Sequence, residues 1–230
     1  PILLFVVLML SLYIPPVQNL LRKELTRYAS QATGMQISMR RIDLRFPFNL
    51  QLSDVGVIQH KDTLLSMGSL NVRIQVLPLF RGEVEVDDLT LRSTSFNSAH
   101  LIKGMQLQGV LGTFSLRSHG VDLSHETALV NALELSDTHV RLKMLKDTVP
   151  EPKDTTAAKI PWKIILQQME VKNVSFSMQL DDDSTQIGAH LGRANLQKLH
   201  VDLHKEAYAL RQLAVDGSSV RYLVGQRKAH

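Results

Sequence analysis

Residues Asn49–Val57, NLQLSDVGV, contain the pattern that decides the fold. Leu50 and Leu52 lie two positions apart, so their side chains point to the same face of a β-strand. Val57 follows Leu52 by five positions and would fall on the opposite face of an unbroken strand. A bend at Asp54 restores the register, because Asp tolerates unusual backbone angles and bonds to the nearby main chain. The stretch predicts a strand that bends in its middle and keeps one apolar face.

The same shape recurs along the chain, with an apolar residue, Leu or Val two positions later, a bend residue, and a closing apolar residue. The copies are Leu50–Val57, Val84–Leu91, Leu133–Val140, Met169–Phe176 and Leu213–Val220. They are spaced roughly 35 to 50 residues apart, which is within the range of repeat architectures. Their predicted strand-bend residues are Asp54, Asp88, Asp137, Asn173 and Gly217. Bending strands in series predict a curved sheet, and a plain antiparallel sheet with ordinary turns is the alternative interpretation.

Composition narrows the class of protein. The 230 residues suffice for one large β domain or two smaller ones. The chain has no cysteine, so disulfides and thiol chemistry are excluded. Its net charge of +4 comes from scattered basic residues without interleaved aromatics, which argues against nucleic-acid binding.

The N-terminal segment Ile2–Ile14 is apolar and uncharged, although it is shorter than the roughly 20 residues that span a bilayer. A signal-peptide core or a buried helix would also fit. Because the chain starts at Pro1, we interpret it as a piece of a longer protein and residues 1–16 as a truncated transmembrane signal anchor. The expected membrane-anchor residues are Ile2, Leu3, Leu4, Phe5, Leu8, Leu10, Leu12 and, at the interface, Tyr13.

Residues 17–34 predict an amphipathic helix. Apolar residues recur at helical spacing between Val17 and Ala32. Pro15 and Pro16 mark its start, and Gly34 suits its C-terminal cap. This helix either lies at a membrane surface or caps the end of the sheet, and we favour the capping role.

Residues 35–230 predict the β region. Leu70–Val76 alternates apolar and polar residues up to Pro78, and Met105–Leu116 carries glycines that suggest close packing. Val121–Leu123 is expected as a further short strand. Residues 146–160, rich in Pro, Thr, Lys and Asp, predict a flexible loop within the region.

The sequence contains no recognisable catalytic motif. His200, Asp202 and His204 could share a strand face, but they form an isolated match to a metal site, and we expect no metal and no cofactor. No phosphate-binding glycine loop and no nucleophile elbow is present, so we expect a protein that is not an enzyme.

An apolar sheet face with few large aromatics predicts a groove that takes a ligand, and acyl chains fit it. The expected lining residues, all apolar, are Leu50, Leu52, Val57, Leu70, Val72, Ile74, Val76, Val84, Val86, Leu91, Leu133, Leu135, Val140, Leu142, Val171, Phe176 and Met178.

The first hundred residues resemble the AsmA-like family of bacterial proteins, to which the TamB-type proteins belong. The resemblance rests on the apolar N-terminus, Thr33-Gly34, Gln36–Leu44, Pro47-Phe48 and Leu50–Val57. It continues through Leu64–Phe96, where Leu70, Val72, Ile74, Leu79, Gly82, Val84, Val86, Leu89 and Leu91 fill the family's pattern.

The resemblance implies a curved, elongated antiparallel β-groove behind a transmembrane helix. It also implies a single-pass inner-membrane protein whose β region lies in the periplasm. Such a bridge-like lipid transfer protein would conduct phospholipids towards the outer membrane. The alternative that it implies is a factor for outer-membrane protein assembly, acting with an Omp85-type β-barrel partner through strand addition. A structural spacer with a closed apolar face is the third interpretation.

Overall fold

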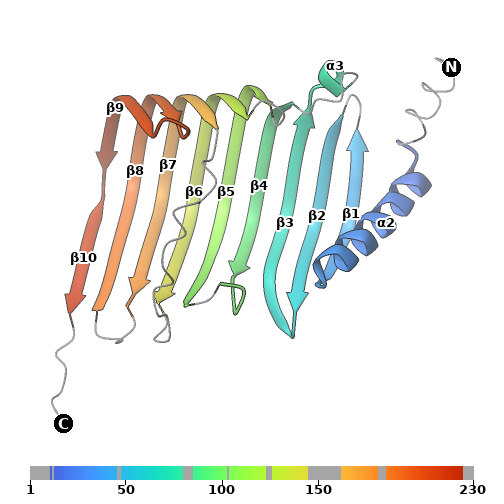
Figure 1. Ribbon diagram of the computed structural model, residues 1–230, viewed down its shortest axis with the longest axis horizontal. Helices are drawn as coiled ribbons and strands as arrows, with labels where there is room; N and C mark the ends of the chain where they lie inside the picture. Colours follow the sequence, from blue (N-terminus) through green and yellow to red (C-terminus); the bar gives the residue numbers. More distant parts are fainter. Residues whose placement is uncertain are drawn as a thin grey trace, which may run out of the picture.

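The computed structural model describes residues 11, 13–45, 48–79, 85–102, 104–122, 126–144, 162–180 and 185–224. Their main element is one curved, open sheet of 10 strands (Figure 1). The strands are β1 (Gln36–Arg45), β2 (Asn49–Gln59), β3 (Asp62–Ile74), β4 (Val86–Asn97), β5 (Met105–Asp122), β6 (Thr127–Met144), β7 (Lys163–Gln179), β8 (Thr185–Asp202), β9 (Ala207–Asp216) and β10 (Ser219–Val224). The prediction of a mainly β, curved sheet is confirmed.

Strands follow one another across the sheet in chain order from β1 to β8. Neighbours are antiparallel except β6 and β7, which are parallel from Thr127↔Lys163 to Lys143↔Gln179. The prediction of an entirely antiparallel sheet is therefore wrong at this pair. Alternating apolar residues predict a strand's faces but not its direction, so the sequence pattern could not reveal the parallel pair.

One long strand forms the last edge of the sheet in two parts. Both β9 and β10 pair antiparallel with β8, from Asp202↔Ala207 to Arg193↔Asp216 and from His190↔Ser219 to Thr185↔Val224. Gly217 lies between the two parts with a φ of 60°. All side chains of β9 and β10 are exposed, so this edge is open.

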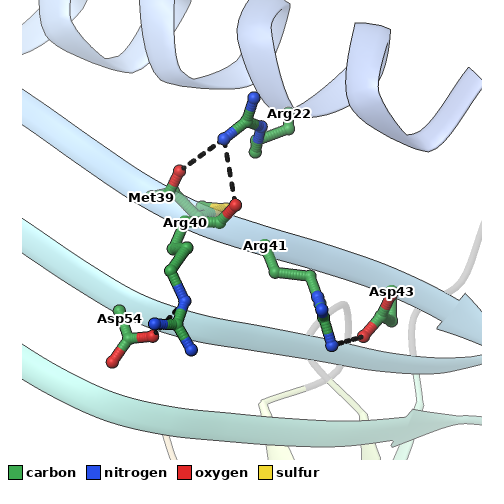
Figure 2. A network of polar contacts seen from close by, with 6 residues as sticks. All are labelled: Arg22, Met39, Arg40, Arg41, Asp43 and Asp54. Atoms are coloured by element: carbon green, nitrogen blue, oxygen red, sulfur yellow. Dashed lines mark hydrogen bonds and ion pairs between the residues drawn. The ribbon is translucent and has the colours of Figure 1, made fainter. Parts of the chain in front are cut away.

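A helix, α2 (Pro15–Thr33), occupies the segment that was predicted to be an amphipathic helix. Prolines occupy its first positions, and Gly34 ends it with a φ of 68° while its N–H donates to the carbonyl of Ser30. The helix lies beside β1 at the first edge of the sheet (Figure 1). The Gln18 side-chain amide donates to the carbonyl of Leu44 at 2.8 Å, and the Arg22 guanidinium donates to the carbonyls of Met39 and Arg40 (Figure 2). The helix thus occupies backbone groups that an edge strand would otherwise present to solvent.

The expected single-pass membrane anchor is contradicted. Within the described residues, no helix is both long enough and apolar enough to cross a bilayer. Of the expected anchor residues, Ile2 to Leu12 lie outside the described part, and only Tyr13 is described. Partial burial raises the pKa of the Tyr13 hydroxyl. The single-pass inner-membrane location, which combined a short apolar run with the family resemblance, is therefore not retained.

Three smaller expectations differ from the structure or lie outside it. Val76 was expected to end a strand, but β3 stops at Ile74 and Val76 begins the short helix α3 (Val76–Leu79). Pro78 lies in that helix, so the chain leaves the sheet earlier than its alternating pattern predicts. Val121 belongs to β5, which runs unbroken to Asp122, and not to a separate strand. The predicted loop at 146–160 lies outside the described residues.

Candidate functional site

A single line of bends crosses the whole sheet at right angles to its strands. Residues with left-handed backbone angles recur at one level, and each lies between the same two flanking rows of partners. They are Asp54, Ser93, Asp137, Asn173 and Gly217, with φ between 50° and 60°. We call this line the crease. It shows that bending is a shared property of neighbouring strands.

Glycine faces a left-handed residue at each antiparallel pair that meets at the crease except β1–β2, where Arg40 faces Asp54. A Cβ atom added to Gly112 would lie 2.7 Å from Cβ of Asp137. One added to Gly68 would lie 3.0 Å from Cβ of Ser93, and one added to Gly192 would lie 2.6 Å from the carbonyl oxygen of Gly217. Real Cβ atoms essentially never come within 3.0 Å of other atoms, so Gly112 and Gly192 leave no room for a side chain and Gly68 leaves very little.

Polar contacts hold the crease where no glycine is available. In the parallel pair β6–β7, the Asn173 side-chain amide donates to the Asp137 carboxylate at 2.7 Å. At the first edge, the Arg40 guanidinium pairs with the Asp54 carboxylate at 2.9 Å (Figure 2). Both pairs are solvent-exposed, so they fix side-chain direction more than they add stability.

Four of the predicted bend residues lie on the crease, and Asp88 does not. The left-handed residue of β4 is Ser93, whereas Asp88 pairs with Arg73 and Arg117 near the start of that strand. Serine is not distinctive at a bend, and only the register between strands places Ser93 opposite Gly68. The sequence pattern therefore had no signal for this position.

Apolar side chains line both sides of the crease in four rows. We define the sides of the crease by the chain direction of β2, in which Leu50 and Leu52 come before Asp54. The two rows before the crease contain, from strand to strand, Ile42, Leu44, Leu50, Leu52, Leu70, Val72, Leu89, Leu91, Phe114, Leu116, Leu133, Leu135, Met169, Val171, Ala194, Leu196, Leu213 and Val215. The two rows after it contain Ile37, Met39, Val55, Val57, Leu65, Met67, Thr94, Phe96, Gly109, Leu111, Thr138, Val140, Val174, Phe176, Ala189, Leu191 and Val220. None of these residues carries a charge.

Burial indicates the direction in which the sheet bends. Most of the buried side chains belong to the two rows that flank the crease, and the list is Ile42, Val55, Met67, Thr94, Thr138, Val171 and Ala194. A bend towards the apolar face brings these rows together, which explains why they are the most covered. No described side chain is less than 2% exposed, so no second layer of described residues covers this face. The result is an open apolar trough.

Most predicted lining residues lie in this trough. Leu50, Leu52, Val57, Leu70, Val72, Leu91, Leu133, Leu135, Val140, Val171 and Phe176 all occupy its four rows. Leu142 and Met178 are partners in a further row, and Ile74 pairs with Val86 at a register shift. Val76 lies in α3, and Val84 lies outside the described residues.

The residues that were missed flank the bend directly. Val55 is buried, yet the repeat pattern assigned only Val57 after Asp54. A left-handed residue adds one position between two apolar rows, so Leu52 and Val55 flank it on the same side of the sheet. The predicted bend at Asp54 implies this shift, since Val55 and Val57 then share a face, but only Val57 was assigned to the lining.

A second level of irregular strand pairing lies beside the trough, further along the strands. Buried Ala128, Val130 and Leu166 form a cluster against which Leu116, Leu133, Trp162, Ile164, Met169, Leu196 and Leu199 pack. At the level of this cluster, the pairing of β5 with β6 has register shifts around Ser118. In β8, Lys198 has a left-handed φ of 53°. In the described part, this cluster packs against the outer row of the trough at Leu116, Leu133, Met169 and Leu196.

The sequence matches no family model. It also matches none of the curated proteins with which it was compared. The resemblance to AsmA-like proteins accordingly remains a prediction, and the trough is the feature of the molecule that indicates a function.

Proposed function

We propose that the chain carries lipids with their acyl chains in the apolar trough. The observation that supports this most directly is the continuity of the four uncharged rows across the strands on an uncovered face. A soluble chain rarely exposes so large an apolar surface unless something binds to it.

The energetics favour an acyl chain as the ligand. Burial of each CH₂ group contributes about 0.8 kcal/mol, so an acyl chain gains substantially by lying along the rows. The trough runs across the strands, perpendicular to their length, and a lipid can slide from one strand to the next without leaving apolar surroundings. No residue performs a reaction in this proposal. The finer proposal, taken from the family resemblance, is that the lipids are phospholipids and move towards an outer membrane.

Adjacent residues on β6 provide a matched test. Leu135 is half-buried in the trough, whereas Ser136 is the next residue and points to the polar face. Leu135→Asp and Ser136→Asp add the same charge to the same strand. We expect Leu135→Asp to reduce co-purifying phospholipid several-fold, because a carboxylate in the trough must be desolvated when a lipid binds. We expect Ser136→Asp to retain the wild-type amount.

The measurement is lipid extraction with quantitative mass spectrometry, alongside transfer of fluorescent phospholipid between vesicles. Circular dichroism and a denaturation midpoint show that both variants are folded. Equal lipid content in the folded Leu135→Asp and Ser136→Asp proteins would contradict the proposal.

A second candidate function is strand addition at the β9–β10 edge, and the exposure of that edge favours it. An extended segment of another protein, such as a nascent outer-membrane strand or part of an Omp85-type partner, would then pair with the free backbone. Strand addition uses backbone groups, so it predicts that Leu135→Asp leaves partner binding unchanged.

A further inference from the structure

A hollow lies on the polar face of the sheet, opposite the trough. Its volume is about 350 Å³, and it spans β6, β7, β8 and β10 close to their ends. Arg141, Ser177, Gly188 and Arg221 are successive partners across these strands and form its central row. Each is the sequence neighbour of a residue in the row of Val140, Phe176, Ala189 and Val220, so these four positions face the opposite side of the sheet.

The floor of the hollow is open and offers an unused hydrogen-bond donor. A Cβ atom added to Gly188 would meet nothing within 4 Å. The Ser177 hydroxyl is buried and has no hydrogen-bond partner in the described part of the chain. A buried hydroxyl without a partner loses free energy, and a bound ligand that accepts its hydrogen bond would restore it.

Two arginines stand at the ends of this row. Arg141 and Arg221 are separated by three strand spacings, which places their backbones about 14 Å apart. Both side chains line the hollow, and neither forms an ion pair with another described residue. The described residues that line the hollow include two arginines and no acidic residue.

We propose that this hollow binds a phosphate group, with one guanidinium on each side and the Ser177 hydroxyl beneath. Guanidinium forks match phosphate oxygens with two parallel hydrogen bonds each. A tetrahedral anion has oxygens for both forks and for the hydroxyl, whereas a planar carboxylate presents oxygens to one fork. The phosphate comes either from the solution or from a phospholipid headgroup at the rim. The proposal does not rest on the trough, because the two sites lie on opposite faces.

The first test is calorimetric titration of the full chain with inorganic phosphate at low ionic strength. We expect Arg141→Gln and Arg221→Gln each to weaken binding by about tenfold or more, because each loses a charge-assisted bidentate contact. Arg193→Gln is the matched control, since Arg193 is an exposed arginine of β8 outside the hollow. Equal affinities for the three variants would overturn the proposal, because binding would then depend on net charge alone.

Gly188→Val tests the hollow without changing any charge. The added side chain fits the open space above β8 and fills the floor, so we expect an unchanged denaturation midpoint and a loss of phosphate affinity of about tenfold or more. Wild-type affinity in the folded Gly188→Val protein would overturn the proposal.

Vesicles distinguish the two sources of phosphate. If the ligand is a headgroup, co-sedimentation with vesicles of phosphatidylglycerol and phosphatidylcholine falls in Arg141→Gln and Gly188→Val. If the ligand is free phosphate, these variants weaken phosphate binding in the titration and leave vesicle binding unchanged, which also supports the proposed site. Leu135→Asp should retain phosphate binding, so failure of the lipid trough and failure of this site give different results.

Discussion

Gly112 shows how a single residue permits the bend of two strands. The carbonyl oxygen of Asp137 lies 2.9 Å from the place where a Gly112 Cβ would sit, and Cβ of Asp137 lies 2.7 Å from it. We expect Gly112→Ala to lower the free energy of unfolding by about 2 kcal/mol, because the backbone of β6 must move to admit one methyl group.

The control for Gly112→Ala lies in the same sheet. Gly188 has open space around its Cβ position, so Gly188→Ala should be neutral or stabilise by about 0.5 kcal/mol through the higher strand preference of alanine. Urea denaturation measures both variants. Similar midpoints for the two would show that the crease does not depend on close contact.

At the scale of elements, α2 protects the first edge of the sheet. Gln18 and Arg22 donate hydrogen bonds to β1 carbonyls, and an uncovered edge strand can pair with another chain. We expect the Gln18→Ala, Arg22→Ala double variant to self-associate at lower concentration than the wild type, measured by sedimentation velocity. Lys23→Ala is the control because Lys23 is exposed and contacts no edge carbonyl. A double variant that behaves like Lys23→Ala would contradict this role of α2.

Helix α2 and most of the bends could be predicted from the sequence. Prolines and Gly34 predict α2 closely, since both act locally on the backbone. Asp54, Asp137, Asn173 and Gly217 were recognisable as bends because their side chains or lack of one favour left-handed angles.

Other features depend on distant partners and could not be predicted. Ser93 bends where Gly68 faces it, and this pairing follows from the register of two strands rather than from either residue alone. The parallel β6–β7 pair and the hollow beside Arg141 likewise depend on residues far apart in the chain.

At the scale of the whole molecule, the open sheet predicts an extended particle. A compact chain of 230 residues has a radius of gyration of about 17 Å. A sheet one layer deep should exceed that value clearly in small-angle X-ray scattering, both with and without bound lipid. A radius near the compact value would mean that the apolar face is packed shut, which would favour the spacer interpretation.

Because of the direction of the crease, the cross-section of the trough and its length are set by two different properties of the sequence. Because the crease runs perpendicular to the strands, the number of residues on either side of it within one strand sets the width and depth of the trough. The number of strands sets only its length, at about 4.8 Å for each strand. Duplication of a strand pair would therefore lengthen the molecule and leave its cross-section unchanged, so such a chain can change its span in evolution without redesigning what it holds.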